Sequence, residues 1–97
     1  MEIAKKTEDG KLVIAVTGRV DTTTAPELDA GLQLVGNETL TLDLSGVPYM
    51  SSAGLRLLLT AHKTMLGRGG ELLIANVQPP VREVFDITGF SDIFNLV

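Results

Sequence analysis

The chain alternates strand-like and helix-like segments from end to end, and this order constrains its fold more than any other feature. Residues 39–45, TLTLDLS, alternate leucines with polar side chains, so the three leucines share one face of a strand. Four more strands are predicted, at residues 2–7, 11–18, 71–76 and 93–97. Three helices are predicted between them: the first opens with TAPEL at residues 24–28, the second runs from about Ser52 to Leu66, and the third follows Pro79-Pro80 and stops at Gly89. Strands joined by helices pair in parallel, so we expect the last four strands to be parallel.

Turn and capping signals mark the ends of these elements. Asp9-Gly10 lies between two extended runs and is typical of a hairpin turn. Thr24, followed three residues later by Glu27, predicts a capping box at the start of the first helix. Gly89 predicts the end of the third helix. The resulting order is β-β-α-β-α-β-α-β.

Residue spacing predicts which faces are buried. The polar side of residues 39–45 indicates that helices cover only one face of the sheet. At about 100° per residue, the first helix gathers on one side Ala25, Leu28, Gly31, Leu32 and Val35. The third helix gathers on one side Val81, Val84, Phe85, Ile87 and Thr88. We therefore predict a single α/β domain over residues 1–97, with a mixed, mostly parallel sheet and helices packed on one face.

Composition limits the classes of partner. The chain has 97 residues and a formal net charge of −4, so general attraction to phosphate backbones or anionic lipid is not expected. It has no cysteine, which excludes disulfides and thiol catalysis. The longest early apolar run, residues 12–16, is far shorter than the roughly 20 residues of a membrane helix. We expect a soluble cytoplasmic protein with no direct nucleic-acid partner, no membrane insertion and no cofactor.

Two adjacent serines precede the central helix, and a second signal separates their roles. A hydrophobic staple joins the residue before the N-cap to the fourth helical residue. With Ser51 as N-cap this pair is Met50 and Leu55, both apolar, whereas Ser52 as N-cap would pair Ser51 with Arg56. Ser51 is therefore the predicted cap, with its oxygen engaged by N–H groups of the first turn.

Ser52 then occupies the first helical position with its hydroxyl uncommitted. An anion attached there would meet free N–H groups and the positive end of the helix dipole. Arg56 lies four residues further on, within i,i+4 reach. This arrangement fits a phosphoserine or anion site, and it also fits a simple cap followed by an uninvolved serine.

Three segments together resemble the STAS domain, and more closely the bacterial anti-sigma factor antagonists. They are GRVDTTTAPEL, LDLSGVPYMSSAGLRLLL and GGELLIANVQPPVREVFDITGF, and the resemblance extends from about Ile3 to Val97. It implies a mixed sheet with helices on one face. It also implies a protein whose unphosphorylated form binds an anti-sigma factor, itself a GHKL-type serine kinase, and so releases the sigma factor. Phosphorylation by that kinase ends the binding, and a PPM-type phosphatase restores the active form.

The same resemblance implies the site residues. The phosphoacceptor falls on Ser52, the acidic residue after the second strand on Asp21, and the glycine of the helix start on Gly54. Ser51 stands where many members have aspartate; both are good caps, so we expect the fold to be unaffected and the lost charge to bear on the choice of kinase. Members usually continue into a C-terminal helix beyond the position of Val97, which concerns one flank of the sheet and not the serine site.

A hydrolase that uses His62 as its base is disfavoured. His62 and Ser52 are about 15 Å apart along the same helix, whereas a base must lie within about 3 Å of its nucleophile. His62 falls within the apolar arc of that helix, which predicts a core histidine bonded to a backbone group. Residues 67–71, GRGGE, lack the lysine of a phosphate-binding loop and predict a helix stop. One histidine and scattered acidic residues predict no metal site, so we expect a binding protein and not an enzyme.

Two alternatives stay open at this level. The chain could be a STAS subunit of another assembly, such as a lipid-transport ABC system or a stressosome-like complex, acting as a non-catalytic binding module. Such subunits also bind partners through this helix end, but their acceptor position is often threonine or is not used as a switch, so SSAGL favours sigma control. Asp21 could simply end a strand, with the threonines after it leading into the next cap.

Overall fold

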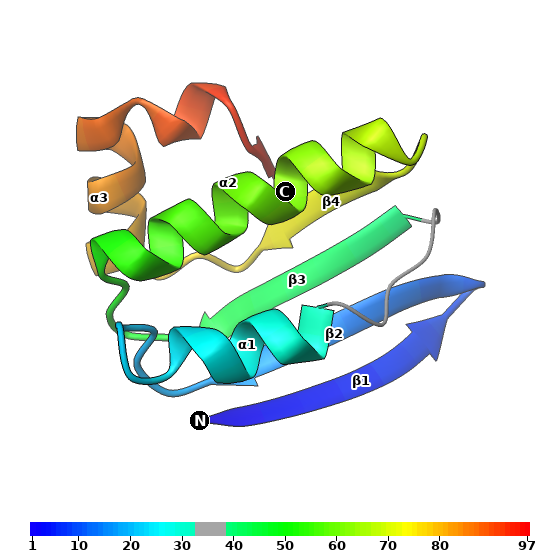
Figure 1. The fold of residues 1–97 in the computed structure, drawn as a ribbon, viewed down its shortest axis with the longest axis horizontal. Coiled ribbons are helices and arrows are strands. Elements are labelled where there is room, and N and C mark those ends of the chain that lie inside the picture. The colour runs from blue at the N-terminus through cyan, green and yellow to red at the C-terminus, as the bar shows by residue number, and fades with distance from the viewer. Residues whose placement is uncertain (33–38) are drawn as a thin grey trace.

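The structure is a computed structural model that describes residues 1–32 and 39–97. Its elements in chain order are β1 Glu2–Glu8, β2 Lys11–Thr17, α1 Ala25–Leu32, β3 Thr39–Gly46, α2 Ser52–Gly67, β4 Glu71–Ala75, α3 Pro79–Thr88, the 3-10 helix η1 Phe90–Asp92 and β5 Asn95–Leu96. The predicted order of strands and helices is confirmed (Figure 1).

The five strands form one mixed sheet in the order β1-β2-β3-β4-β5. β1 is antiparallel to β2, and every later pair of neighbours is parallel, as predicted. Leu42 at the centre of β3 lies between Ile14 of β2 and Ile74 of β4. All three side chains are fully buried, so this register joins the central strands into one continuous apolar surface.

The turn between β1 and β2 has the geometry predicted for it. Asp9 and Gly10 both have positive φ, at 52° and 78°. Two consecutive residues with positive φ are what a type I′ hairpin turn requires, and Asp-Gly tolerates this conformation well. The hairpin prediction is confirmed.

Helices cover one face of the sheet. The leucines Leu40, Leu42 and Leu44 of β3 are buried, whereas Thr41 and Asp43 on the opposite side of the strand are only half-buried. Figure 1 shows α1 and α2 side by side in front of the sheet. The arrangement predicted from the polar side of β3 is confirmed.

The buried face of α3 is narrower than its predicted face. Val81 and Phe85 are buried, but Ile87 is 77% exposed and Thr88 is also exposed, so the prediction was wrong for these two residues. Ile87 follows Phe85 by two residues, or roughly 200° around the helix, and therefore points away from the core. The hydroxyl of Thr88 donates instead to the carbonyl of Val84, at 2.8 Å.

Two further predictions concern α1 and the last strand. α1 buries Leu28 and Leu32 as predicted, while Val35 lies outside the described residues. The last strand is shorter than the predicted residues 93–97, because η1 brings the chain around and only Asn95–Leu96 pairs with β4.

His62 lies in the core, as predicted, with 9% of its surface exposed. Its ring meets Phe94 edge-on, with the ring centroids 5.9 Å apart. Its Nδ1 atom is buried without a hydrogen-bond partner, so the predicted bond to a backbone group is wrong for this atom. A buried polar atom without a partner costs stability.

No helix in the described part of the chain is long and apolar enough to cross a bilayer. Within residues 1–32 and 39–97, no three or more histidine, cysteine or acidic side chains are grouped so that they could hold a metal ion.

Candidate functional site

Two loops meet at the carboxyl ends of β2 and β3, and backbone hydrogen bonds tie them together. The Val20 N–H donates to the carbonyl of Tyr49 at 3.0 Å, and the Ser51 N–H donates to the carbonyl of Val20 at 2.8 Å. Val20 and Met50 thereby form an isolated parallel bridge beyond the strands. The bridge places residues 19–21 beside residues 49–52, so the two segments predicted to share a site do lie together.

The two serines occupy the positions predicted for them. α2 begins at Ser52, which is exposed, and Ser51 takes the N-cap position with the extended dihedrals φ −85° and ψ 175°. The Ser51 hydroxyl nevertheless makes no capping bond, and its oxygen is buried without a partner. The prediction that this oxygen engages the first turn was therefore wrong. The Ser51 backbone is already held by Val20 and by the N–H of Leu55, so the helix start does not depend on a side-chain cap.

Gly54 lies beneath the site and does not line its surface. The residue is buried, and a Cβ atom added to it would come within 2.7 Å of Met50 Cγ and 2.7 Å of Val20 Cγ1. Real Cβ atoms essentially never approach a neighbour this closely. Gly54 therefore allows the first turn of α2 to pack directly on the bridge between the two loops.

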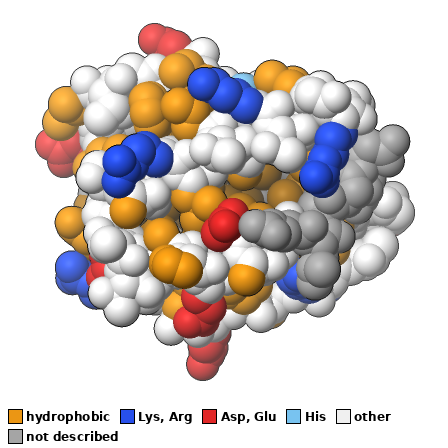
Figure 2. Space-filling view, viewed as in Figure 1, with side chains coloured by type: hydrophobic (Ala, Val, Ile, Leu, Met, Phe, Trp, Pro, Cys, Tyr) orange, Lys and Arg blue, Asp and Glu red, His pale blue; other side chains and the backbone are white. Residues whose placement is uncertain are grey.

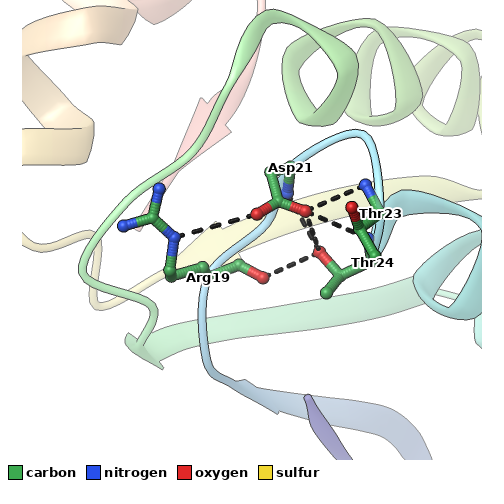
Figure 3. A network of polar contacts seen from close by, with 4 residues as sticks. All are labelled: Arg19, Asp21, Thr23 and Thr24. Carbon is green, nitrogen blue, oxygen red and sulfur yellow. Dashed lines mark hydrogen bonds and ion pairs between the residues drawn. The ribbon is translucent and has the colours of Figure 1, made fainter.

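Asp21 caps the turn that leads into α1, as Figure 3 shows. Its Oδ1 accepts hydrogen bonds from the N–H groups of Thr23 at 2.9 Å and Thr24 at 3.1 Å. In return, the N–H of Asp21 donates to the Thr24 hydroxyl oxygen at 2.9 Å. These reciprocal bonds are a capping box. It joins Asp21 to Thr24, so the box predicted between Thr24 and Glu27 was wrong; the Glu27 N–H bonds the carbonyl of Thr24 instead.

These bonds also fix the charge of Asp21. The N–H of Thr24 is the largest of the causes that hold the pKa of the Asp21 carboxyl below its usual range. The N–H of Thr23, the hydroxyl of Thr24 and the guanidinium of Arg19 act in the same direction. Asp21 is therefore a carboxylate at neutral pH, held in place by the backbone of its own loop.

Arg19 and Tyr49 complete the surface formed by the two loops, and the sequence does not single out either of them. The guanidinium carbon of Arg19 lies 4.4 Å from the centroid of the Tyr49 ring. Its Nε lies 3.7 Å from Asp21 Oδ2, and the Thr24 hydroxyl donates to the Arg19 carbonyl at 2.8 Å. The only sequence signal is their place in the two motifs that contain Asp21 and Ser52.

Arg56 lies exposed on α2, one turn after Ser52. Together with residues of α1 and α2, including Pro26, Ala53 and Thr60, it lines a shallow groove of about 430 Å³ between the two helices. Its action on a phosphate at Ser52 stays a prediction.

Figure 2 shows acidic and basic side chains dispersed among apolar ones on this face of the molecule, with no large area of one sign.

Comparisons with known proteins define the class. The STAS domain family matches residues 2–97, so the chain belongs to the STAS domain family. A protein of Bordetella bronchiseptica named as an anti-sigma factor antagonist, BtrV, is 38% identical over 97 residues, which cover 97% of this chain and 84% of that protein. An anti-sigma-B factor antagonist of Listeria monocytogenes is 33% identical over 95 residues, covering 95% of this chain and 83% of that protein.

A solved structure agrees with this assignment. The crystal structure of an anti-sigma factor antagonist from Mycobacterium paratuberculosis superposes with a TM-score of 0.87 at 27% sequence identity. The match covers 98% of this chain and 83% of that one. The resemblance drawn from the three sequence motifs is confirmed at the level of family and fold.

Proposed function

We propose that this chain is an anti-sigma factor antagonist that works as a partner switch. Its unphosphorylated form binds a GHKL-type serine kinase that also acts as an anti-sigma factor, and this binding releases the sigma factor. The kinase phosphorylates Ser52 and ends the binding, and a PPM-type phosphatase reverses the step. The names of the relatives support the antagonist role. The observation that carries the switch is the exposed Ser52 at the first position of α2, beside a Ser51 whose hydroxyl oxygen is buried.

The helix start suits a phosphate while the protein is free. A phosphoserine carries about −1.5 to −2 charges and three strong acceptor oxygens. At Ser52 these oxygens would meet backbone N–H groups at the positive end of the α2 dipole. The phosphorylated protein should therefore stay folded.

The same phosphate opposes binding once a partner covers the site. An interface shaped to receive a small neutral hydroxyl would bury the new charge without a counter-charge. A loss of about 4 kcal/mol weakens binding about a thousandfold. Phosphorylation thus changes the affinity for the partner and leaves the fold intact.

Phosphorylation is tested with each GHKL-type serine kinase encoded in the same genome, purified and incubated with the protein and Mg-ATP. Intact-protein mass spectrometry with fragment mapping should find one phosphate, on Ser52. Ser51→Ala serves as the matched control and should still be labelled, whereas Ser52→Ala should accept none. A phosphate on Ser51, robust labelling of Ser52→Ala, or no labelling of the wild type by any of these kinases would contradict the proposal.

Binding is measured with the kinase that labels Ser52. The unphosphorylated protein should bind it, while the phosphorylated protein and Ser52→Asp should not, with circular dichroism spectra like the wild type. Thr64→Asp adds one negative charge near the other end of α2, at an exposed position, and should bind like the wild type. Equal affinities of the phosphorylated and unphosphorylated proteins would refute the switch.

A further inference from the structure

We propose that Arg19, stacked on Tyr49 and paired with Asp21, selects the protein partner by binding a carboxylate on the partner's surface. This inference rests on the proposed function, because it concerns the partner that binds over Ser52. It adds a specificity-determining residue and the chemistry that this residue recognises.

The Arg19 guanidinium is held from two sides. The Tyr49 ring supports its face at 4.4 Å, and Asp21 Oδ2 lies 3.7 Å from Nε. A distance of 3.7 Å is too long for a hydrogen bond, so Asp21 orients the group by charge alone. Asp21 itself cannot follow Arg19, because its other oxygen accepts the N–H groups of Thr23 and Thr24. The guanidinium is thus positioned before any partner arrives.

The donors of this guanidinium face outward. Figure 3 shows the two terminal nitrogens of Arg19 pointing away from Asp21. Neither of them donates a hydrogen bond within the described part of the chain, and the side chain is 64% exposed. Two parallel N–H groups in a plane match the two oxygens of a carboxylate, which is the geometry that distinguishes arginine from lysine.

Arg19 lies close enough to Ser52 in the fold to belong to the same interface. The backbone bonds between Val20 and the segment 49–51 hold the Arg19 loop against the start of α2. A protein partner that covers Ser52 with an interface of ordinary size, about 800 Å² on each side, should reach the Arg19 loop and Tyr49 as well. Arginine and tyrosine are the residue types enriched at binding hot spots, and Tyr49 is 43% exposed and available for contact.

A carboxylate of the partner explains this arrangement better than a phosphate on Ser52. The pair of Arg19 and Tyr49 is assembled in the unphosphorylated protein, which is the form proposed to bind. A phosphate neutralised by Arg19 would repel the partner less and so weaken the switch. A carboxylate of the partner would instead bind Arg19 in the unphosphorylated protein, the form in which binding is proposed to occur.

The first test is a binding titration of the kinase that labels Ser52 against the wild type, Arg19→Gln and Arg19→Glu. Arg19→Gln should weaken binding about 30-fold or more, and Arg19→Glu should weaken it further. Lys11→Gln is the matched control, since it removes one exposed positive charge at the opposite end of β2 and should change the Kd less than threefold. Circular dichroism spectra should be unchanged in all variants, and any phosphate that the kinase adds should still map to Ser52, although more slowly in the variants that bind it weakly.

The second test is a charge exchange. Each exposed aspartate and glutamate of the kinase is changed to lysine in turn. One of these kinase variants should no longer bind the wild-type protein but should bind Arg19→Glu, which the unchanged kinase binds only weakly. Regained binding identifies the carboxylate, which a general loss of stability could not do.

The outcomes separate the two proposals. If Arg19→Gln binds like the wild type while phosphorylation still abolishes binding, the Arg19 inference is wrong and the switch stands. If Arg19→Gln lowers the melting temperature of the phosphorylated protein but leaves the affinity for the kinase unchanged, Arg19 stabilises the phosphate and the inference is again wrong. If the unphosphorylated wild type binds none of the kinases, both proposals fall.

Discussion

A single methyl group added at Gly54 should destabilise the protein, although alanine is the better helix former. The new Cβ would lie 2.7 Å from Met50 Cγ and 2.7 Å from Val20 Cγ1. Carbon atoms pack best at about 3.5–4.0 Å, so both neighbours would have to move. The methionine side chain can rotate, but Val20 is fully buried and its branched side chain is stiff.

The two opposing effects can be weighed. Overpacking a core costs about 1–3 kcal/mol, and replacing glycine by alanine within a helix gains about 1 kcal/mol. Because the rigid Val20 puts the cost near the top of that range, Gly54→Ala should lower the free energy of unfolding by about 2 kcal/mol. For a domain of this size, the melting temperature should fall by about 10 °C.

Urea denaturation followed by circular dichroism measures this change, and a second glycine of α2 provides the control. A Cβ at Gly67 would meet no heavy atom within 4 Å, so Gly67→Ala should leave stability unchanged or raise it by up to about 1 kcal/mol. The free energy of unfolding should therefore fall in Gly54→Ala and stay the same or rise in Gly67→Ala. A Gly54→Ala protein at least as stable as the wild type would refute the packing argument.

Three further predictions follow from the same structure and can be measured by urea denaturation. Ser51→Ala should change the free energy of unfolding by less than about 0.5 kcal/mol, because the hydroxyl has no partner; a loss near 1 kcal/mol, typical of a missing cap, would show that it does cap α2. His62→Leu should raise stability by about 1 kcal/mol by removing the unpaired Nδ1, and a loss would show that the contact with Phe94 matters more. Asp21→Asn keeps a capping oxygen but removes the charge. Since the pKa of Asp21 is lowered in the folded protein, the stability advantage of the wild type should be complete above the ordinary aspartate pKa of about 3.9 and disappear as the pH falls through the lowered value. An advantage that is equal at neutral and acid pH would contradict the role given to this carboxylate.

The fold could be predicted from local patterns because each pattern depends on residues a few positions apart. Alternation in residues 39–45 is enough to identify a strand with one buried face, and Asp9-Gly10 is enough to identify a hairpin turn. The staple between Met50 and Leu55 located the start of α2 at Ser52 without any tertiary information. Parallel pairing then followed from the helices that join the strands.

The hydrogen-bond partners of polar side chains could not be predicted in this way, because they depend on which loops the fold brings together. The Thr24 hydroxyl can bond N–H groups on either side of it, and the loop after β2 turns it back toward Asp21 and Arg19. Ser51 sits at the predicted cap position, yet its backbone is held by Val20 and its hydroxyl stays unpaired. Spacing along one helix cannot reveal a bond that comes from another segment.

What the sequence by itself determined is therefore the order of the elements, the buried face of the sheet and the exposed serine at the start of α2. Only the tertiary structure decided what surrounds that serine. Arg19 and Tyr49 are 30 positions apart in the chain. The Arg19 guanidinium lies over the Tyr49 ring because the bridge between Val20 and Met50 joins the two loops. Gly54 likewise matched a motif, but its reason is the close approach of α2 to that bridge. Contacts of this kind depend on distances across the fold, which no pattern of neighbouring residues encodes.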